Sequence, residues 1–353
     1  MSLHSSDSTQ LMLSLFEKSN SHNSSVSSSV ITPLTPAQIP LDLSDINLKL
    51  LQEHQIHNKL QNKINELRIN TYNSCNNTNH LDYNLHFNFK KNEKIVFIMV
   101  GLPASGKSTI SKQLNEYFNK FTQLSSKIYN AGNVRRKCQL KNDANFFDPN
   151  DENATLLREN YVNITIGNLI TDLNNDVINI GFLDATNSTI DRRKRMIDKI
   201  IDEIPNPTII LMNVVNNNIH QNNFNIACKT KNPDYSMKNY YDSINDFKIR
   251  TQHYLKIYEP ITTKELINYP INLYINFENG GEIFDINRFD NMNLNFLSLL
   301  DHFVRNYPEN FGKEYLKRVH DWIEFIEGLG MNENCNDLDS DFLKSNLKAE
   351  LQG

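Results

Sequence analysis

Long apolar runs, closely spaced cysteines and an excess of basic residues are all missing from this 353-residue chain. No segment approaches the ~18 consecutive apolar residues that span a membrane. The four cysteines, Cys75, Cys138, Cys228 and Cys335, form no C-x-x-C pair, which argues against a disulfide framework or a zinc site. The formal net charge of −5 offers no general attraction for nucleic acid. We therefore expect reduced thiols and a protein that binds neither membranes nor nucleic acid.

The N-terminal residues also lack the basic start and apolar core of a secretory signal, which predicts a cytoplasmic protein. Residues 1–40 are expected to be disordered, because residues 19–30 are rich in Ser and Asn and nearly free of apolar side chains. Thr32 and Thr35 each precede a proline and are candidate sites for regulatory protein kinases. An unmodified tail is the alternative.

Glycine is scarce, at 11 residues, but two glycines frame the most informative stretch, GLPASGKST at residues 101–109. An apolar run at 95–100 precedes it and a helical pattern at 110–121 follows it. Strand, glycine-rich turn and helix form the context of a phosphate-binding loop of the G-x-x-x-x-G-K-[ST] type. In such a loop Lys107 reaches the terminal phosphates and the Ser108 hydroxyl holds Mg²⁺. The alternative is an ordinary strand-to-helix turn.

Beyond residue 93 apolar runs alternate with helical patterns. Strands are expected at 95–100, 127–130, 177–183, 208–215 and 272–277, and helices at 110–121, 152–174, 192–203 and 235–258. This alternation predicts an α/β fold with a doubly wound, mainly parallel sheet, of the P-loop nucleoside triphosphate hydrolase-like type. Ligands of such sheets bind at the carboxyl ends of the strands, where Gly101, Gly132, Asp184 and Val215 fall.

The remaining segments complete the expected domain organisation. Residues 41–93 are predicted to hold a helix at 44–69, which docks on the core or on a partner, and a linker in which residues 85–89 alternate like an edge strand. Two amphipathic patterns, at 294–304 and 311–326, follow the last strand and extend the catalytic domain to 94–328. Residues 329–353 are a polar tail.

Several side chains near the expected ligand edge could carry chemistry. Asp184 ends a strand near the phosphate-binding loop, so its carboxylate could bind Mg²⁺ or accept the proton of an attacking hydroxyl; it could also simply cap the following turn. Thr186 and Asn187 are either turn residues or substrate ligands. Arginine forks suit phosphate, although an isolated arginine is more often a solvated surface residue. The candidate arginines are Arg135, Arg136, Arg158, Arg192, Arg193 and Arg250.

Six strings of residues in this chain resemble those of a known family. The resemblance rests on the strings VGLPASGKSTISKQL, IYNAGNVRRK, FFDPNDENATLLR, FLDATNST-x-x-RR, K-x-x-NPDY and DFKIRTQHY. They are similar, in register over residues 94–277, to the kinase half of 6-phosphofructo-2-kinase/fructose-2,6-bisphosphatase. The early strings are specific, whereas those from Lys229 onward are looser.

The resemblance implies roles for individual residues. It assigns ATP to Gly101, Leu102, Pro103, Ala104, Ser105, Gly106, Lys107, Ser108 and Thr109, together with Asn225 and Lys229. It assigns fructose 6-phosphate to Arg135, Arg158, Thr186, Arg192, Lys229, Arg250 and Tyr254. Lys107 and Asp184 take the catalytic roles, and Ser108 and Asp184 take the Mg²⁺.

Two departures from the family pattern stand out. The cysteine that family members carry after the third clear strand is absent, since that stretch reads VVNN at 214–217. The R-H-G string that carries the phosphatase nucleophile is also absent, and the nearest string is RVH at 318–320. We therefore expect a kinase that makes fructose 2,6-bisphosphate with ATP and Mg²⁺, without a phosphatase domain, and that can form a homodimer. The alternatives are a P-loop kinase acting on a polynucleotide 5′ end or a nucleotide, and a non-catalytic regulatory homologue.

Overall fold

The computed structural model describes residues 89, 93–138, 143–230, 232–238, 240–289 and 292–328. All of them belong to the unit that spans Leu43–Gly353. The predicted tail at 1–40, the helix at 44–69 and the polar segment at 329–353 lie outside the described residues, as does all of the suggested edge strand except Phe89, which is not in a strand. No helix among the described residues is long and apolar enough to cross a membrane.

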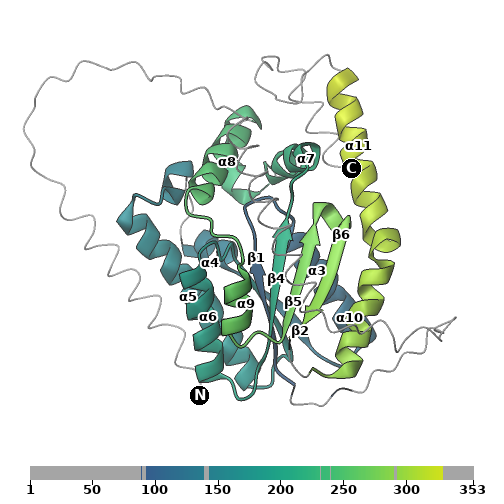
Figure 1. Ribbon diagram of the computed structural model, residues 1–353. Coiled ribbons are helices and arrows are strands. Elements are labelled where there is room, and N and C mark those ends of the chain that lie inside the picture. Colours follow the sequence, from purple (N-terminus) through teal and green to yellow (C-terminus); the bar gives the residue numbers. More distant parts are fainter. Residues whose placement is uncertain are drawn as a thin grey trace, which may run out of the picture. The chain divides into compact units, whose positions relative to one another are not determined.

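A six-stranded sheet forms the centre of the described fold (Figure 1). Its strands are β1 (Ile95–Val100), β2 (Ser126–Asn130), β3 (Ile180–Asp184), β4 (Thr208–Val215), β5 (Leu273–Glu278) and β6 (Ile283–Arg288). Their order is β2-β3-β1-β4-β5-β6, and every neighbouring pair is parallel except β5 and β6. The first five strands confirm the five predicted from the sequence. The sixth was not predicted, because three of its residues, Asp285, Asn287 and Arg288, are polar.

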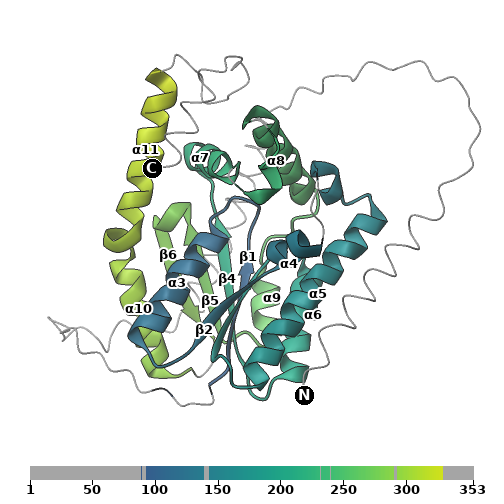
Figure 2. The ribbon, with the colours of Figure 1, turned by 180° about the vertical axis from the view of Figure 1, so that it is seen from behind.

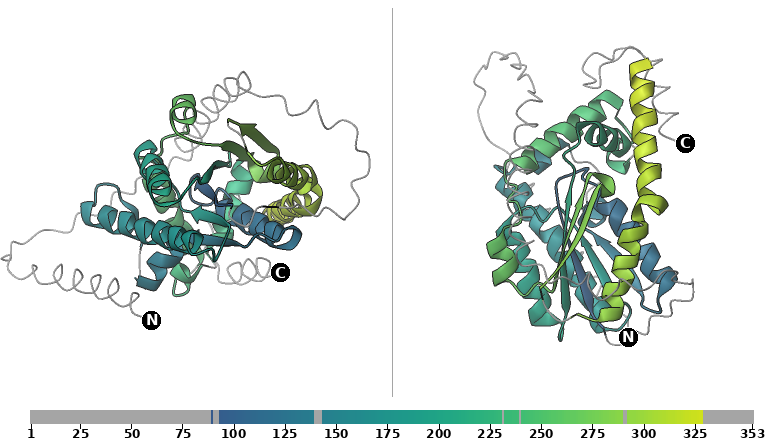
Figure 3. Two further views of the ribbon diagram at one scale, coloured as in Figure 1. Left: turned by 90° about the horizontal axis from the view of Figure 1, so that it is seen from below. Right: turned by 45° about the vertical axis from the view of Figure 1, so that its right-hand side comes forward.

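The sheet is covered on both faces, which is why β1 is apolar throughout. Val96, Ile98 and Val100 pack in one core with α5 (Glu152–Asn174), α6 (Ile190–Glu203) and α9 (Thr263–Asn268). The alternate residues of β1 pack in a second core with α3 (Lys107–Phe121) and α10 (Leu294–Tyr307). Figures 2 and 3 show these two helical layers on opposite faces. A strand buried on both faces needs a continuous apolar run, so the predicted doubly wound α/β fold is confirmed.

Three helices stand near the carboxyl edge of the sheet, where the predicted ligands should bind. They are α4 (Ala131–Cys138), α7 (Ile219–Lys229) and α8 (Tyr240–Leu255), and α11 (Lys313–Gly328) passes beside α7 (Figure 1). The helix predicted at 235–258 is confirmed as α8, although it is shorter at both ends, and a short 3-10 turn, η3 (Pro233–Tyr235), precedes it. The helix α7 is capped at its N-terminus by Asn218, whose side chain accepts hydrogen bonds from the backbone N–H groups of His220 and Gln221.

Arg193, one of the candidate phosphate-binding arginines, is a buried structural residue. Its side chain is fully buried, and its guanidinium binds both carboxylate oxygens of Glu265 in α9, at 2.6 and 2.7 Å. It also donates to the backbone carbonyls of Asn187 and Glu259, at 3.1 and 2.9 Å. Arg193 therefore ties the turn after β3 to the segment before α9, and this turn directly follows Asp184.

We expect Arg193→Ala to lower the free energy of unfolding by about 3–5 kcal/mol, because it leaves the buried carboxylate of Glu265 without its partner. Urea denaturation followed by circular dichroism measures the change. The neighbouring Lys194→Ala removes a solvent-exposed pair with Asp198 and should leave the midpoint nearly unchanged. Equal effects of the two substitutions would show that the Arg193–Glu265 pair does not hold this turn.

Candidate active site

The loop between β1 and α3 has the backbone geometry that its glycines predict. Gly101 has φ +149°, and a Cβ at this position would lie 2.2 Å from the carbonyl oxygen of Val214 in β4. Gly106, at the start of α3, has φ +105°, and Ala104 between them has φ +64°. The loop thus packs directly on the neighbouring strand and presents the N-terminus of α3, an arrangement that favours phosphate.

Lys107 is buried beneath this loop. Its Nζ donates hydrogen bonds to the carbonyl oxygens of Gly101 and Leu102, at 2.8 and 2.6 Å. Burial, together with the nearby cations of Lys229 and Arg250, lowers the pKa of Lys107 to about 7, although the Asp184 carboxylate opposes the shift. Burial also lowers the pKa of Lys229, which stands nearby at the end of α7. Both lysines would be stabilised in their charged forms by a bound anion.

Asp184 ends β3 beside the loop, and its carboxylate accepts two hydrogen bonds. Ser108 Oγ donates to Asp184 Oδ2 at 2.7 Å, and Asn130 Nδ2 donates to the same oxygen at 2.5 Å. Asn130 was not singled out from the sequence, although it ends β2 directly opposite Asp184 in the parallel register. That pairing of strand ends is the signal that could have identified it.

The oxygen atoms of Ser108 and Asp184 fit the predicted Mg²⁺. Mg²⁺ commonly keeps several waters and takes one or two carboxylates in addition to substrate phosphates. The two side chains supply a hydroxyl and a buried carboxylate that already lie within 2.7 Å of each other. The described residues contain no group of three or more His, Cys, Asp and Glu side chains that could bind a metal by themselves.

One cavity of about 410 Å³ opens next to these residues. The structure brings together in its lining most of the predicted site, namely Pro103, Ala104, Lys107, Ser108, Arg135, Arg158, Asp184, Thr186, Lys229, Arg250 and Tyr254. Arg192 and Asn225 are not among the lining residues. Thr109 is exposed one turn into α3. Residues predicted for nucleotide and for sugar thus share a single cavity.

Three arginines that line the cavity converge on one carboxylate, that of Asp234. Arg135 reaches it at 2.5 Å, Arg136 at 3.5 Å and Arg250 at 3.8 Å. The guanidinium of Arg250 also lies 3.9 Å from the ring centroid of Phe147. Burial and the neighbouring Arg250 lower the pKa of Arg135, whereas Asp234 opposes the shift. Three cations around one carboxylate leave an excess of positive charge for an anionic ligand.

The other two predicted arginines have different surroundings. Arg158 lines the cavity, and its guanidinium donates to the Phe146 carbonyl and, at 2.7 Å, to Thr155 Oγ1. Arg192 instead forms an ion pair with Glu159 of α5. Arg135 and Arg192 thus resemble each other in sequence, each being the first of an arginine pair, but only Arg135 lines the cavity.

Thr186 and Asn225 contact the phosphate-binding loop from two sides. The Thr186 carbonyl accepts a hydrogen bond from the Gly101 backbone at 3.2 Å. The Asn225 side chain, from α7, donates through Nδ2 to the Ala104 carbonyl at 2.9 Å. The adjacent Asn187 donates to the Met99 carbonyl at 2.7 Å. Backbone contacts of this kind fix the loop in place.

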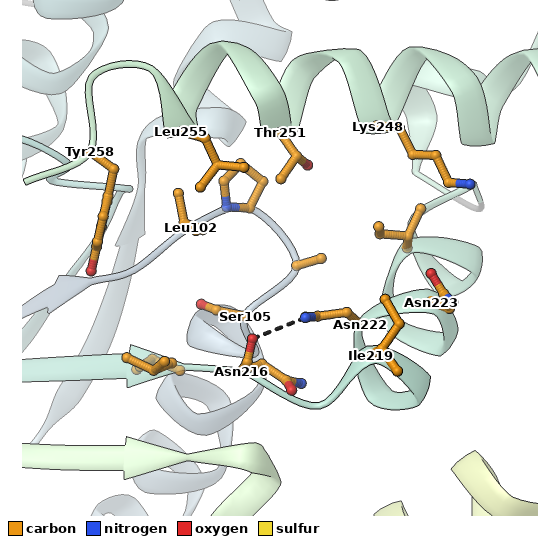
Figure 4. A pocket seen from close by; sticks show the side chains of 15 residues that line it. Leu102, Ser105, Asn216, Ile219, Asn222, Asn223, Lys248, Thr251, Leu255 and Tyr258 are labelled. Carbon is orange, nitrogen blue, oxygen red and sulfur yellow. Dashed lines mark hydrogen bonds between the residues drawn. The ribbon is translucent and has the colours of Figure 1, made fainter. Parts of the chain in front are cut away.

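A second, smaller cavity of about 70 Å³ lies on the other side of the loop. Figure 4 shows Leu255 and Thr251 pointing from α8 toward the loop that carries Leu102 and Ser105. Most of its lining is apolar, and the Asn222 side chain closes one wall by donating to the Asn216 carbonyl at 3.0 Å. The smaller cavity thus presents a mostly apolar lining beside the loop, whereas most of the charged groups line the larger cavity.

Comparison with known proteins identifies relatives of the matched region. A family model described as 6-phosphofructo-2-kinase matches residues 83–297. The 6-phosphofructo-2-kinase 1 of Saccharomyces cerevisiae is 35% identical over 181 residues, which are 50% of this chain and 22% of that protein. A probable 6-phosphofructo-2-kinase of Schizosaccharomyces pombe is 38% identical over 175 residues, 49% of this chain and 26% of that protein. The alignments thus cover about a quarter of these relatives' length.

A solved structure of a fungal RNA kinase is also similar, at 13% identity and a TM-score of 0.33, over 74% of this chain and 98% of that one. This similarity is too distant to bear on fold or function.

We expect Gly101→Ala to weaken Mg·ATP binding strongly and to cost on the order of 1–3 kcal/mol of stability, because the new Cβ collides with the β4 backbone at a positive φ. Calorimetric titration and urea denaturation measure the two effects. Gly167→Ala in α5 is the matched control, since a Cβ there meets nothing within 4 Å. It should stabilise the helix by about 0.5–1 kcal/mol. Normal ATP binding by the Gly101 variant would contradict the prediction that ATP binding depends on the conformation of this loop.

Proposed function

Because this chain belongs to the 6-phosphofructo-2-kinase family, we propose that it transfers the γ-phosphoryl group of ATP to the 2-hydroxyl of fructose 6-phosphate. The product is fructose 2,6-bisphosphate. One observation carries the proposal. Lys107 after the phosphate-binding turn and Asp184 at the end of β3 line the same cavity as an arginine cluster, which consists of Arg135, Arg158 and Arg250. Such an arrangement can hold two phosphorylated substrates face to face.

The ATP phosphates would lie on the Gly101–Thr109 loop, against its backbone N–H groups and the charged form of Lys107. Mg²⁺ held by Ser108 and Asp184 would supply neutralisation of phosphate charge. The 2-hydroxyl oxygen bonds to the γ-phosphorus as the bond to the bridging oxygen of ADP breaks, and the Asp184 carboxylate takes the hydroxyl proton. Positioning and charge neutralisation provide most of the acceleration.

The 6-phosphate of the sugar would bind at the arginine cluster. Arg135 and Arg250 are both within reach of Asp234, so a phosphate dianion there competes with that carboxylate for the same two guanidinium groups. Arg158 and Tyr254 line the same cavity. Lys229 also lines it and interacts electrostatically with Asp184 and Arg250, which suits a residue that contacts both substrates.

The direct experiment incubates the protein with Mg·ATP and fructose 6-phosphate and looks for an acid-labile bisphosphate, with Lys107→Met as the inactive control. A 5′-hydroxyl oligonucleotide is offered as a competing acceptor. Formation of the acid-labile sugar bisphosphate supports the proposal. Labelling of the oligonucleotide alone would replace it with a polynucleotide kinase, and the absence of any transfer would favour a non-catalytic homologue.

We expect Arg250→Ala to raise KM for fructose 6-phosphate about ten- to a hundredfold with little change in KM for ATP, because one partly desolvated charge-assisted contact is worth ~1.5–3 kcal/mol. Initial rates at varied sugar and varied ATP give the two constants. Arg305→Ala, which removes a half-exposed arginine paired with Asp301 on α10, is the control and should leave both constants unchanged. An unaltered KM for the sugar would exclude Arg250 from phosphate binding.

We also expect Mg·ATP binding to take up protons in a pH-dependent way. Lys107 has a pKa of about 7 without ligand, so it is largely neutral at pH 8.5 and charged at pH 6. Phosphate favours the charged form, and binding should therefore take up close to one proton at pH 8.5 and almost none at pH 6. Calorimetry in two buffers of different ionisation enthalpy measures the uptake. Equal uptake at both pH values would contradict the lowered pKa.

A further inference from the structure

We propose that Tyr315 of α11 is a positioning residue for the nucleotide-binding loop and acts through Asn225 of α7. The proposal rests on the assignment of ATP to the Gly101–Thr109 loop. Tyr315 lies beyond residue 297, where the match to the family model ends, so the family assignment gives it no role.

The helix α11 is packed along α7 by one aromatic face. The ring centroid of Phe224 in α7 lies 6.1 Å from that of Tyr315 and 6.0 Å from that of Trp322. Positions 315 and 322 are two helical turns apart and lie on the same side of α11. Arg318 stands between them, with its guanidinium 5.7 Å from the same Phe224 ring. Figures 1 and 3 both show α11 beside α7.

The Tyr315 hydroxyl is the polar end of this packed face. It lies 3.2 Å from Asn225 Oδ1 and 3.4 Å from Gln221 Oε1, so it can donate to one of these amides at a time. Burial raises the pKa of Tyr315 to about 12, which keeps the hydroxyl protonated and a donor at physiological pH. With its Oδ1 facing Tyr315, the Asn225 amide turns its Nδ2 toward the loop.

Asn225 in turn contacts the phosphate-binding loop. Its Nδ2 donates to the carbonyl oxygen of Ala104 at 2.9 Å. Ala104 has φ +64°, a conformation that an alanine holds only when its surroundings support it. The hydroxyl of Tyr315 thus orients the amide that holds the one non-glycine residue of the loop with a positive φ.

The Tyr315 ring also packs against the turn that follows β5. The ring lies over the turn after β5, where a Cβ on Gly280 would come within 2.3 Å of Tyr315 Cε1. Gly280 itself has φ +65°, so the turn presents bare backbone to the ring. Tyr315 is therefore held between this turn and Phe224, and its hydroxyl points at the asparagine that reaches the loop.

The test is Tyr315→Phe, which keeps the packed ring and removes only the hydroxyl. We expect the dissociation constant of Mg·ATP to rise about three- to tenfold, the effect of one lost buried hydrogen bond, with KM for fructose 6-phosphate unchanged. Tyr307→Phe is the matched control: Tyr307 is buried and its hydroxyl bonds Gln113 of α3 at 3.2 Å, away from the loop. It should leave ATP binding unaltered.

A double-mutant cycle with Asn225→Ala tests the route. If Tyr315 acts through Asn225, removal of the hydroxyl should weaken ATP binding no further once Asn225 is gone. Full additivity, an unchanged ATP affinity in Tyr315→Phe, or an equal loss in Tyr307→Phe would overturn the proposal. Because ATP binding is titrated directly, weaker binding in a protein that fails to phosphorylate the sugar would refute the proposed acceptor and leave the role of Tyr315 intact.

Discussion

The site depends on one carboxylate oxygen, Oδ2 of Asp184, which joins the carboxyl ends of three neighbouring strands. It accepts hydrogen bonds from Asn130 at the end of β2 and from Ser108 in the first turn after β1, and Asp184 itself ends β3. Parallel pairing brings these three positions to one edge, so the negative charge is fixed by the sheet and not by a loop.

The charge of the site is opposite in sign to that of the chain. Lys107, Lys229, Arg135 and Arg250 line a cavity to which Asp184 contributes one carboxylate, with Asp234 directly behind the arginines. Burial lowers the pKa values of both lysines, which is the signature of cations that lack enough compensating charge. A net charge of −5 therefore says nothing against a site for phosphorylated ligands. Local concentration of cations in a low-dielectric cavity decides what binds there.

The sequence pattern predicted those parts of the structure that depend on residues close together in the chain. A buried parallel strand must be apolar and a phosphate-binding turn must contain glycine, so β1, its loop and Asp184 could be read from sequence. The roles of Asn130 and Arg193 were not predicted, because the partners that give them these roles, Asp184 and Glu265, are distant in sequence. The helix α7 was missed because its asparagines are weak helix formers, and packing against α8 and α11 overrides that preference.

The helix α7 contacts the phosphate-binding loop, the arginine-lined cavity and α11. Asn225 and Lys229 are one turn apart on the same face; the first holds the Ala104 carbonyl of the loop and the second lines the cavity shared with the arginines. On another face Phe224 packs against α11. A helix moves as a rigid body, so a shift of α7 displaces the loop contact and the cavity contact together. The contact with the loop and the contact with the cavity therefore share one support, the helix α7, on which α11 packs.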